Sequence, residues 1–489
     1  MSLNLLICWG RILIKERHVL DEIFNPRSIA VVGASPDPNK AGYHFFKGLT
    51  DLKFDGAIYP INLNGSNVLG FKGYRNLRDV PASIDYVIVA IPAYKVPKII
   101  ENCAAKGVKV AHIFTSGFSE TGRADRIELE AQIAEIARAG NVRVIGPNCM
   151  GIYHPKIGLS NFGVFQSKES GSVGFISQSG GNTGDFGRMG RVRGLRFSKL
   201  VSYGNASDLD STDFMEYFAW DSETKIICAY IEGVKDGRRF AKVLKEAAMA
   251  KPVVILKGGL TKAGTRAVSS HTGVLAGSDA IWTALFNQTG AIQVESLREM
   301  IDLALAFSYM SRPNGRRVGI VGIGGGASVA VADFCEKAGL IVPRFTEGTM
   351  ARLEKITPVA GTSVKNPVDS PVGHRVAVPE YEETLRLVAS DPQIDLLIVH
   401  LTIDWRIQTP EDRKNLHDLT EVLIKNKKSL GKPVAAVLRS CQSLHSWQVF
   451  LEEQNRCSEG GIPVYLTLED AANAVSKLIQ YYEFREKVT

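Results

Sequence analysis

Short apolar, β-branched runs alternate with amphipathic stretches along almost the whole chain, and this alternation limits the fold more than any other feature. Residues 28–33 have the composition of a strand, residues 42–52 that of a helix, and residues 86–91 that of a further strand. The apolar runs are continuous, which is typical of strands buried on both faces of a parallel sheet. The pattern therefore predicts an α/β fold built on doubly wound parallel sheets.

The alternation continues through three successive units. A chain of 489 residues has room for about three domains at roughly 150 residues each. We predict an N-terminal extension at 1–23, a Rossmann-like domain at 24–150, a second α/β domain at 155–310 and a third at 314–489. Residues 311–315 break both periodicities and are expected to link the last two domains.

The charge pattern argues against a nucleic-acid-binding protein. The formal net charge is only +7, and the one tight basic run, formed by Lys425, Lys427, Lys428 and Lys432, contains no aromatic residue. We interpret that run as a solvated helix end. An anionic small ligand remains compatible with this composition, because it needs only a few local positive groups.

The cysteines and the apolar runs limit the cellular setting. Seven cysteines are scattered along the chain, so that neither a CxxC pair nor a thiolate zinc cluster is assembled locally. This spacing favours a reducing cytoplasm. No apolar stretch reaches the ~18 residues of a membrane span, and the first 20 residues lack the features of a secretory signal. We therefore expect a cytoplasmic protein with no metal site of its own.

Three glycine-rich turns lie between a predicted strand and a predicted helix, where backbone N–H groups and the positive end of a helix can face an anion. They are Gly33-Ala34-Ser35, Ser179-Gly180-Gly181 and Gly324-Gly325-Gly326. The first lacks the Gly-x-Gly-x-x-Gly pattern, and no acidic residue ends the next strand, so NAD is disfavoured. A tight turn needed only for packing is the alternative there, and plain helix capping is the alternative for the second. The three consecutive glycines favour an anion site for the third.

A polar, small-residue segment lies at residues 269–278 and contains His271. It is too rich in glycine and serine for a core strand, so we interpret it as a loop. A neutral imidazole is a nucleophile that can carry a phosphoryl group. From the residues alone, an ordinary exposed histidine is the alternative.

Five motifs in this order resemble the nucleoside-diphosphate-forming acyl-CoA synthetases, the superfamily of succinyl-CoA synthetase. They lie at residues 24–35, 146–151, 177–181, 270–273 and 366–369, and the resemblance covers residues 24–489. It is closest to the alpha subunits of ADP-forming acetate–CoA or acyl-CoA synthetases. The resemblance implies a Rossmann-like CoA-binding domain followed by two flavodoxin-like ligase domains.

The resemblance also implies a reversible relay through acyl phosphate and phosphohistidine. Acyl-CoA and phosphate give acyl phosphate and CoA, the phosphoryl group moves to His271, and ADP then accepts it to form ATP. Glu232 matches a carboxylate that orients the histidine, while the turns at Ser179-Gly180-Gly181 and Gly324-Gly325-Gly326 match the phosphate-binding helix ends. Further residues match the region that binds CoA, its pantetheine arm and acyl phosphate: Gly33, Ala34, Ser35, Lys40, Ile91, Pro92, Ser116 and Asn148. Cys149 is expected to pack rather than to react.

One departure from the family predicts a partner. The reaction needs an ATP-grasp module to bind ATP or ADP with Mg²⁺, and after the three predicted domains no stretch of about 200 residues is left to supply it. The resemblance therefore implies a separate ATP-grasp beta subunit, with α₂β₂ the usual assembly. The competing hypothesis is a CoA or acyl-CoA sensor of the same fold without turnover. His271 and Glu232 favour the enzyme, because a sensor needs no nucleophile.

Overall fold

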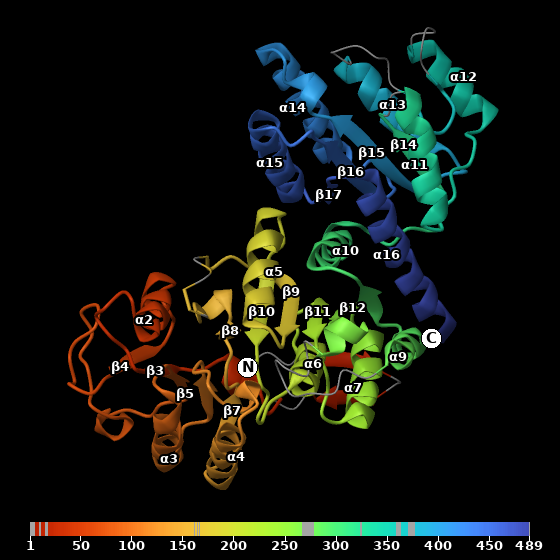
Figure 1. Cartoon of the computed structure of the whole chain (residues 1–489). Coiled ribbons are helices and arrows are strands. Elements are labelled where there is room, and N and C mark those ends of the chain that lie inside the picture. Colours follow the sequence, from red (N-terminus) through yellow and green to blue (C-terminus); the bar gives the residue numbers. More distant parts are fainter. Residues whose placement is uncertain are drawn as a thin grey trace. The chain divides into compact units, whose positions relative to one another are not determined.

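The computed structural model forms two compact units (Figure 1). It describes residues 18–160, 162–163, 165, 167–266, 278–322, 325–357, 363–369 and 377–488, with the backbone alone for 5–8, 11–14 and 325–329. The first unit comprises Met1–Gly184, Phe197–Lys251 and Lys257–Trp282, and the second comprises Asp185–Arg196, Pro252–Leu256 and Thr283–Thr489. The division into three domains at the expected boundaries stays a prediction.

The first unit contains a fully parallel five-stranded sheet with strand order β4-β3-β5-β6-β7. Its strands are β3 (Ser28–Val32), β4 (Ala57–Ile61), β5 (Tyr86–Val89), β6 (Val110–Ile113) and β7 (Arg143–Ile145), and its helices are α2 (Ala41–Asp51), α3 (Val96–Lys106) and α4 (Ala124–Ala139). The chain leaves β3 for β4 on one side and returns to β5 on the other. The carboxyl ends of β3 and β5 therefore form the switch point at which such sheets bind ligands.

A second set of strands in this unit is mixed. β9 (Ser170–Ser177) pairs in parallel with β10 (Phe197–Ser202) and β11 (Ile226–Ile231), while β8 (Gly151–Tyr153) pairs antiparallel with β10. The helices that follow the parallel strands are α5 (Gly180–Val192), α6 (Ser211–Trp220) and α7 (Gly237–Ala250). Asp210 and Asp236 cap α6 and α7 by accepting backbone N–H groups of their first turns.

The amino-terminal residues join the core of the first unit. The backbones of β1 (Leu5–Cys8) and β2 (Arg11–Ile14) pair antiparallel, and α1 (Asp21–Phe24) follows them. Leu20 and Ile23 are buried, and the Phe24 ring stacks on Tyr217 with centroids 4.1 Å apart. Leu20 and Ile23 of the predicted extension are thus part of the packed structure.

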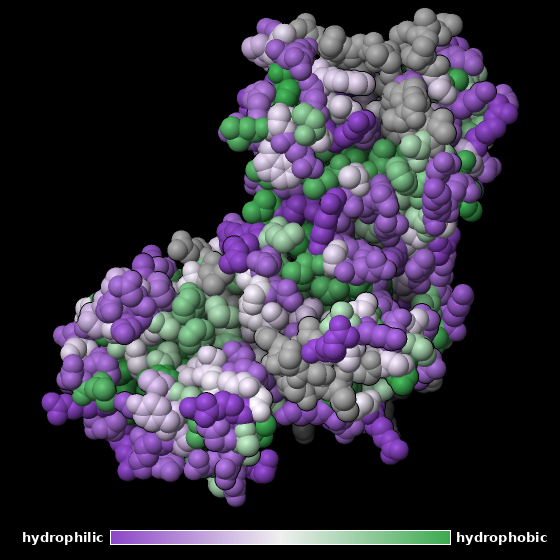
Figure 2. Space-filling view, viewed as in Figure 1, coloured by the Kyte–Doolittle hydropathy of each residue, from purple (hydrophilic) through white to green (hydrophobic). Residues whose placement is uncertain are grey.

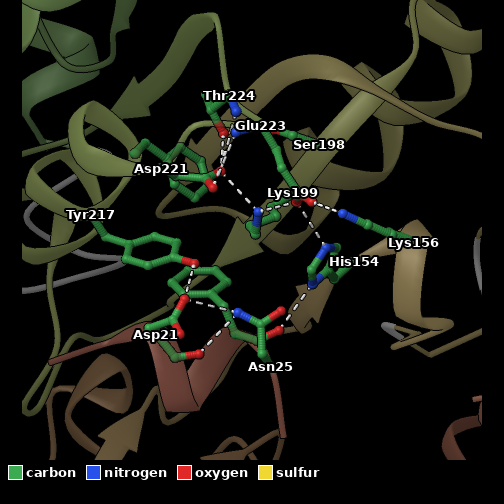
Figure 3. Close-up of polar contacts among 12 residues, drawn as sticks. Asp21, Asn25, His154, Lys156, Ser198, Lys199, Tyr217, Asp221, Glu223 and Thr224 are labelled. Carbon is green, nitrogen blue, oxygen red and sulfur yellow. Dashed lines mark hydrogen bonds and ion pairs between the residues drawn. The ribbon is translucent and has the colours of Figure 1, made fainter. Parts of the chain in front are cut away.

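A network of charged groups fastens this region (Figure 3). His154 Nδ1 lies 2.9 Å from the carbonyl oxygen of Phe24, and His154 Nε2 lies 3.3 Å from Glu223 Oε2. Lys199, in β10, is 1% exposed and donates to Asp221 at 2.8 Å and to Glu223 at 2.7 Å. The ammonium is buried but paired with two carboxylates, as a buried charge requires.

The second unit contains a parallel sheet with strand order β14-β15-β16-β17. Its strands are β14 (Val318–Val321), β15 (Leu396–Thr402), β16 (Val434–Arg439) and β17 (Val464–Tyr465); the helices are α9 (Asp279–Thr289), α10 (Leu297–Tyr309), α11 (Gly325–Lys337), α12 (Glu347–Ile356), α13 (Val378–Ser390), α14 (Pro410–Asn426), α15 (Leu444–Glu459) and α16 (Leu468–Val488). β12 (Val253–Lys257) pairs in parallel with β13 (Ile292–Val294). The parallel strands confirm the predicted α/β fold class.

Hydrophilic residues cover most of the face of each unit that Figure 2 shows. Of the helices in the described part of the chain, none is both long enough and apolar enough to cross a membrane. The expected helix end around Lys425 is present, but two of its lysines are not simply solvated. Lys427 donates to the carbonyl oxygen of Gly461, and Lys432 donates to that of Asp391 at 2.7 Å.

Candidate functional site

A cleft of about 850 Å³ opens at the carboxyl ends of β3, β4 and β5. Gly33 ends β3 with φ +94°, and a Cβ added there would lie 2.3 Å from the carbonyl oxygen of Ala90. A Cβ added to Gly42 in α2 would lie 2.0 Å from the carbonyl oxygen of Gly33. Only glycine permits this conformation and this close approach, so the turn places backbone directly at the cleft.

This cleft contains all six residues predicted at the first glycine turn and the next strand end. They are Gly33, Ala34, Ser35, Lys40, Ile91 and Pro92. The lining adds Arg75, Lys95 and Lys98, so four cations face the cleft, and its described lining contains no carboxylate. We call it the cationic cleft. Its charge suits a ligand with several phosphate groups.

Two apolar side chains stand at the rim of the cationic cleft. Tyr94 is 69% exposed and Leu63 is 82% exposed, although both belong to residue types that are usually covered. Flat exposed rings and aliphatic groups of this kind can sandwich a purine base. The cleft therefore offers both parts of a recognition site for a nucleotide-like ligand.

A second cleft, of about 310 Å³, lies at the amino end of α5 and is called the α5 cleft. Its lining includes Ser116, Asn148, Ser179, Gly180 and Gly181, which are the remaining residues that the sequence predicted for this region. Ser179 Oγ accepts the backbone N–H of Asn182 at 3.2 Å, so the serine does cap the helix, which was the alternative interpretation of this turn. The remaining N–H groups of the first turn and the helix dipole favour an anion here.

Hydrogen bonds with neighbouring side chains fix the loop that carries Asn148. The Gly146–Pro147 peptide is cis, and Asn148 has φ +59°. Asn148 Nδ2 donates to Asn205 Oδ1 at 3.3 Å, and Asn205 Nδ2 donates to Glu120 at 2.7 Å. Burial alone would raise the pKa of Glu120, but hydrogen bonds from Asn205 and three backbone N–H groups lower it. The glutamate is thus ionised and fixes the orientation of the asparagines.

The two clefts are neighbours on one edge of the sheet. Thr115 Oγ1 donates to the carbonyl oxygen of Ile91 at 2.7 Å. Ile91 lines the cationic cleft, and Ser116, the next residue after Thr115, lines the α5 cleft. A flexible ligand anchored in the first cleft can therefore extend into the second.

Cys149 also lines the α5 cleft but is unsuited to attack. It is 4% exposed, and burial strongly raises the pKa of its thiol. Its carbonyl oxygen lies 3.1 Å from Nε2 of the buried His112, whose pKa burial lowers to about 4. The packing role expected for Cys149 agrees with this environment.

Glu232 directly follows β11 and is buried. Its backbone N–H donates to Gln178 Oε1 at 3.1 Å, and Tyr230 Oη donates to its Oε1 at 3.1 Å. Gln178 also lines the α5 cleft, so a single side chain connects Glu232 to that cleft. Lys257 Nζ donates to the Glu232 carbonyl oxygen at 2.8 Å. The backbone of Glu232 is therefore fixed by Gln178 and Lys257, and its carboxylate accepts from Tyr230, at the carboxyl edge of β9 and β11.

Two predicted positions, His271 and Gly324, lie outside the described residues. Gly325 and Gly326 begin α11, as the third turn predicts. Gly322, just before that turn, has φ +100°, and a Cβ there would lie 2.2 Å from the carbonyl oxygen of His400. This turn also depends on glycine. Among the described residues, no group of three or more His, Cys, Asp or Glu is placed to hold a metal ion.

Sequence reasoning missed several residues of these sites. Arg75, Lys95 and Lys98 reach the cationic cleft from a loop and from the start of α3, and nothing local marks them. A signal for Lys257 was present, because a lysine ends the apolar run Val253–Lys257 of a buried strand. Such a lysine needs partners, which here are at the site.

Comparison with known proteins gives matches over both units. A family model described as "CoA binding domain" matches residues 27–155, and one described as "Succinyl-CoA ligase like flavodoxin domain" matches residues 170–307. The chain is 38% identical to "Acetate--CoA ligase [ADP-forming] II subunit alpha" of Pyrococcus furiosus, covering 94% of this chain and 98% of that one. It is 36% identical to "Acetate--CoA ligase [ADP-forming]" of Methanocaldococcus jannaschii, over 97% of this chain but 64% of that protein's length.

A solved structure is also similar. It is "dinucleotide forming Acetyl-coenzyme A synthetase 1" of Ca. Korarchaeum cryptofilum in complex with phosphate and ADP, with a TM-score of 0.83 and 32% identity. The match covers 96% of this chain and 98% of that one. The similarity therefore extends over the fold as a whole and not over one domain alone.

Proposed function

The chain belongs to the family of ADP-forming acetate–CoA ligases, and we propose that it is the subunit that binds CoA and phosphate and carries the phosphorylated histidine. The observation that carries this proposal is the adjacency of the two clefts through Thr115 and Ile91. One cleft has the charge for a CoA nucleotide, and the other has a helix end for phosphate. The acyl thioester would lie where they adjoin.

The cationic cleft would hold the nucleotide end of CoA. Lys40, Arg75, Lys95 and Lys98 supply positive charge for its phosphate groups, and Tyr94 and Leu63 supply apolar surface for adenine. The absence of a side chain at Gly33 would let the ligand approach the backbone closely. The pantetheine arm would then run past Thr115 toward Ser116 and Asn148.

The first chemical step would occur in the α5 cleft. A phosphate oxygen attacks the thioester carbonyl carbon, the C–S bond breaks, and CoA leaves as its thiolate. The N–H groups of Gly180 and Gly181 and the dipole of α5 would stabilise the phosphate, while the amide of Asn148 would donate to the charge that develops on the carbonyl oxygen. The products are acyl phosphate and CoA.

The second step would use His271 and Glu232. An imidazole nitrogen attacks phosphorus, the P–O bond to the acyl group breaks, and the carboxylate leaves with the electron pair. The other ring nitrogen keeps its proton and donates a hydrogen bond to Glu232, whose negative charge stabilises the positive charge on the ring. The buried and firmly held position of Glu232 supports this role.

The third step would take place with a partner. The name of the Pyrococcus furiosus relative marks it as a subunit, and the longer Methanocaldococcus jannaschii relative has additional sequence. We propose that a separate ATP-grasp beta subunit binds ADP or ATP with Mg²⁺, in an α₂β₂ complex in the cytoplasm. Phosphohistidine would meet ADP there, with the turn Gly324-Gly325-Gly326 as a second helix end that holds its phosphoryl group.

The proposal is tested with the chain alone. The purified chain is mixed with acetyl-CoA and inorganic phosphate, and intact mass spectrometry is used to look for one acid-labile phosphoryl adduct. The adduct is expected in the unmodified chain and absent from His271→Asn, with CoA binding retained in both by calorimetry. CoA binding without any adduct in the unmodified chain would contradict the proposed turnover and favour a sensor.

A further inference from the structure

Lys257 is the last residue of β12, and its side chain lies at the carboxyl edge of the strands, where Glu232 also lies. It is 4% exposed, although lysine is among the residues least often buried. Burying an ammonium is costly unless its N–H groups are all used. The contacts of the Lys257 side chain therefore indicate its role.

Lys257 Nζ has two hydrogen-bond acceptors and one aromatic ring around it. It donates to the carbonyl oxygen of Glu232 at 2.8 Å and to the carbonyl oxygen of Gly258. It also lies 5.0 Å from the centroid of the Trp282 ring, a cation–π arrangement. The Trp282 ring is itself fixed edge-on against Phe240 at 5.7 Å.

Two of these three partners flank the part of the chain that contains His271. Gly258 and Trp282 stand at the two ends of the stretch that contains His271. Gly258 is anchored on its other side, because its N–H donates to the carbonyl oxygen of Ile231 at 2.9 Å. A single ammonium thus contacts the backbone of Glu232 and both ends of the histidine-bearing stretch.

We propose that Lys257 is a positioning residue for phosphoryl transfer: its ammonium fixes Glu232 relative to both ends of the stretch that bears His271, and its charge offsets that of the phosphohistidine. The inference rests on the proposed relay. If His271 pairs with Glu232 as the relay requires, its phosphoryl group would add negative charge beside the Glu232 carboxylate, and like charges in a buried site repel strongly. In the proposed relay the Lys257 ammonium, which contacts the Glu232 carbonyl oxygen, would offset part of this charge.

The electrostatics of the pair agree with this role. Burial lowers the pKa of Lys257 to about 8, while the negative charge of Glu232 opposes that shift. The ammonium is therefore retained at neutral pH in a site where desolvation disfavours it. Methionine could fill the same space, but it could not donate to the carbonyl oxygens of Glu232 and Gly258.

The chain offers a matched control at the other end of the same strand. Lys251, just before β12, also donates its ammonium to two backbone carbonyl oxygens, those of Phe218 and Asp221. It lies at the amino edge of the strands, away from Glu232. Replacing Lys251 therefore tests the loss of a comparable lysine without touching the carboxyl edge.

The experiment compares Lys257→Met, Lys257→Gln and Lys251→Met in the full chain. The rate of phosphoryl adduct formation from acetyl-CoA and inorganic phosphate is measured by quenched-flow intact mass, with CoA affinity and thermal midpoint alongside. We expect the rate to fall at least about 10-fold in both Lys257 variants, with CoA affinity unchanged, because misplaced catalytic groups cost rate rather than binding. Lys251→Met is expected to keep the rate even if its midpoint falls.

The outcomes are distinguishable. If either folded Lys257 variant forms the adduct at the unmodified rate, the inference is overturned. Lys257→Gln keeps a donor in place, so it provides the test if Lys257→Met does not fold. If the unmodified chain forms no adduct while binding CoA, the proposed function itself fails, and this inference fails with it. Lys257→Arg, which keeps the charge, is expected to recover part of the rate.

Discussion

Lys199 Nζ lies 2.8 Å from Asp221 Oδ2, and both side chains are buried in the first unit (Figure 3). The same ammonium donates to Glu223, which in turn contacts His154 and Lys156. This network joins β10 to β8 and to the loop before β11. It lies outside both clefts, so its contribution is to the stability of the scaffold.

Replacing Lys199 is expected to destabilise the protein strongly. Lys199→Met leaves Asp221 buried without its cation, and removing one partner of a buried ion pair typically costs about 3–5 kcal/mol. Lys156→Met removes a partner of Glu223 that is 62% exposed, which should cost about 1 kcal/mol or less. Urea unfolding followed by circular dichroism measures both. Equal midpoints for the two variants would contradict the structural role of the buried pair.

The same network predicts a loss of stability in acid. His154, Lys156 and Lys199 hold the pKa of Glu223 well below its usual range despite partial burial, and Lys199 lowers that of Asp221 against the effect of burial. A carboxyl whose pKa is lower in the folded state stabilises it above the ordinary carboxyl pKa, and this contribution is lost as the pH falls. The free energy of unfolding should therefore fall between about pH 5 and pH 3. Glu223→Gln should show a shallower slope; an unchanged slope argues against this source.

The cationic cleft predicts the salt dependence of CoA binding. Lys40→Ala and Arg75→Ala each remove a cation from the cleft lining, and a hydrogen bond to a charged phosphate contributes about 1.5–3 kcal/mol. Each variant should bind CoA about 10-fold more weakly or worse and lose part of its dependence on ionic strength. Lys47→Ala is the control, since Lys47 lies on α2 outside the cleft and bonds Asp51. Titration calorimetry at two salt concentrations measures this, and equal affinities in all three variants would exclude the cleft.

Periodicity predicted parallel strands where the apolar run is continuous, as in β3 and β5. It missed β10, whose run Phe197–Ser202 has Lys199 in its centre. A lysine in the interior of a strand is unfavourable unless carboxylates from elsewhere meet it, and Asp221 and Glu223 do so from more than 20 positions away. The local hydrophobic pattern contains no information about such distant partners, so it could not predict this strand.

The same limit applies to the site. The glycine turns were predictable, since Gly33 needs its positive φ and its close approach to Ala90 whatever surrounds it. Arg75 and Lys98 were not, because side chains from separate loops meet only when the sheet forms. Glu232 was identified by resemblance, but its hold by Gln178 and Lys257 depends on the parallel register of neighbouring strands.

Glu232→Gln is expected to separate chemistry from binding. The amide keeps the shape of the carboxylate and can still accept a hydrogen bond, but it has no charge to stabilise the imidazolium. Adduct formation should slow by about 10²–10⁴-fold, with CoA affinity unchanged. Glu216→Gln, an exposed carboxylate of α6 paired with Arg239, is the control and should behave as the unmodified chain. A normal rate in Glu232→Gln would remove the carboxylate from the relay.

Deprotonation of Lys257 at alkaline pH is expected to raise stability and to lower the rate of phosphoryl transfer. Its pKa is lowered by burial to about 8 from 10.5, with the Glu232 charge opposing, so between these values the unfolded chain binds a proton that the folded chain does not. The free energy of unfolding therefore rises with pH across this window, since the folded state no longer carries a buried charge. The charge that holds Glu232, Gly258 and Trp282 is lost at the same time.

The rate of phosphoryl transfer should accordingly fall as the pH passes about 8, while stability from this group increases. Comparison with Lys257→Met isolates both effects, because methionine has no proton to lose and should show neither the added stability nor this alkaline limb. The measurements are adduct rate and urea midpoint at intervals from pH 7 to pH 10.5 in the two proteins. A limb that persists in Lys257→Met would assign the titration to another group, and a limb absent from the unmodified chain would show that the charge on Lys257 does not matter for the transfer.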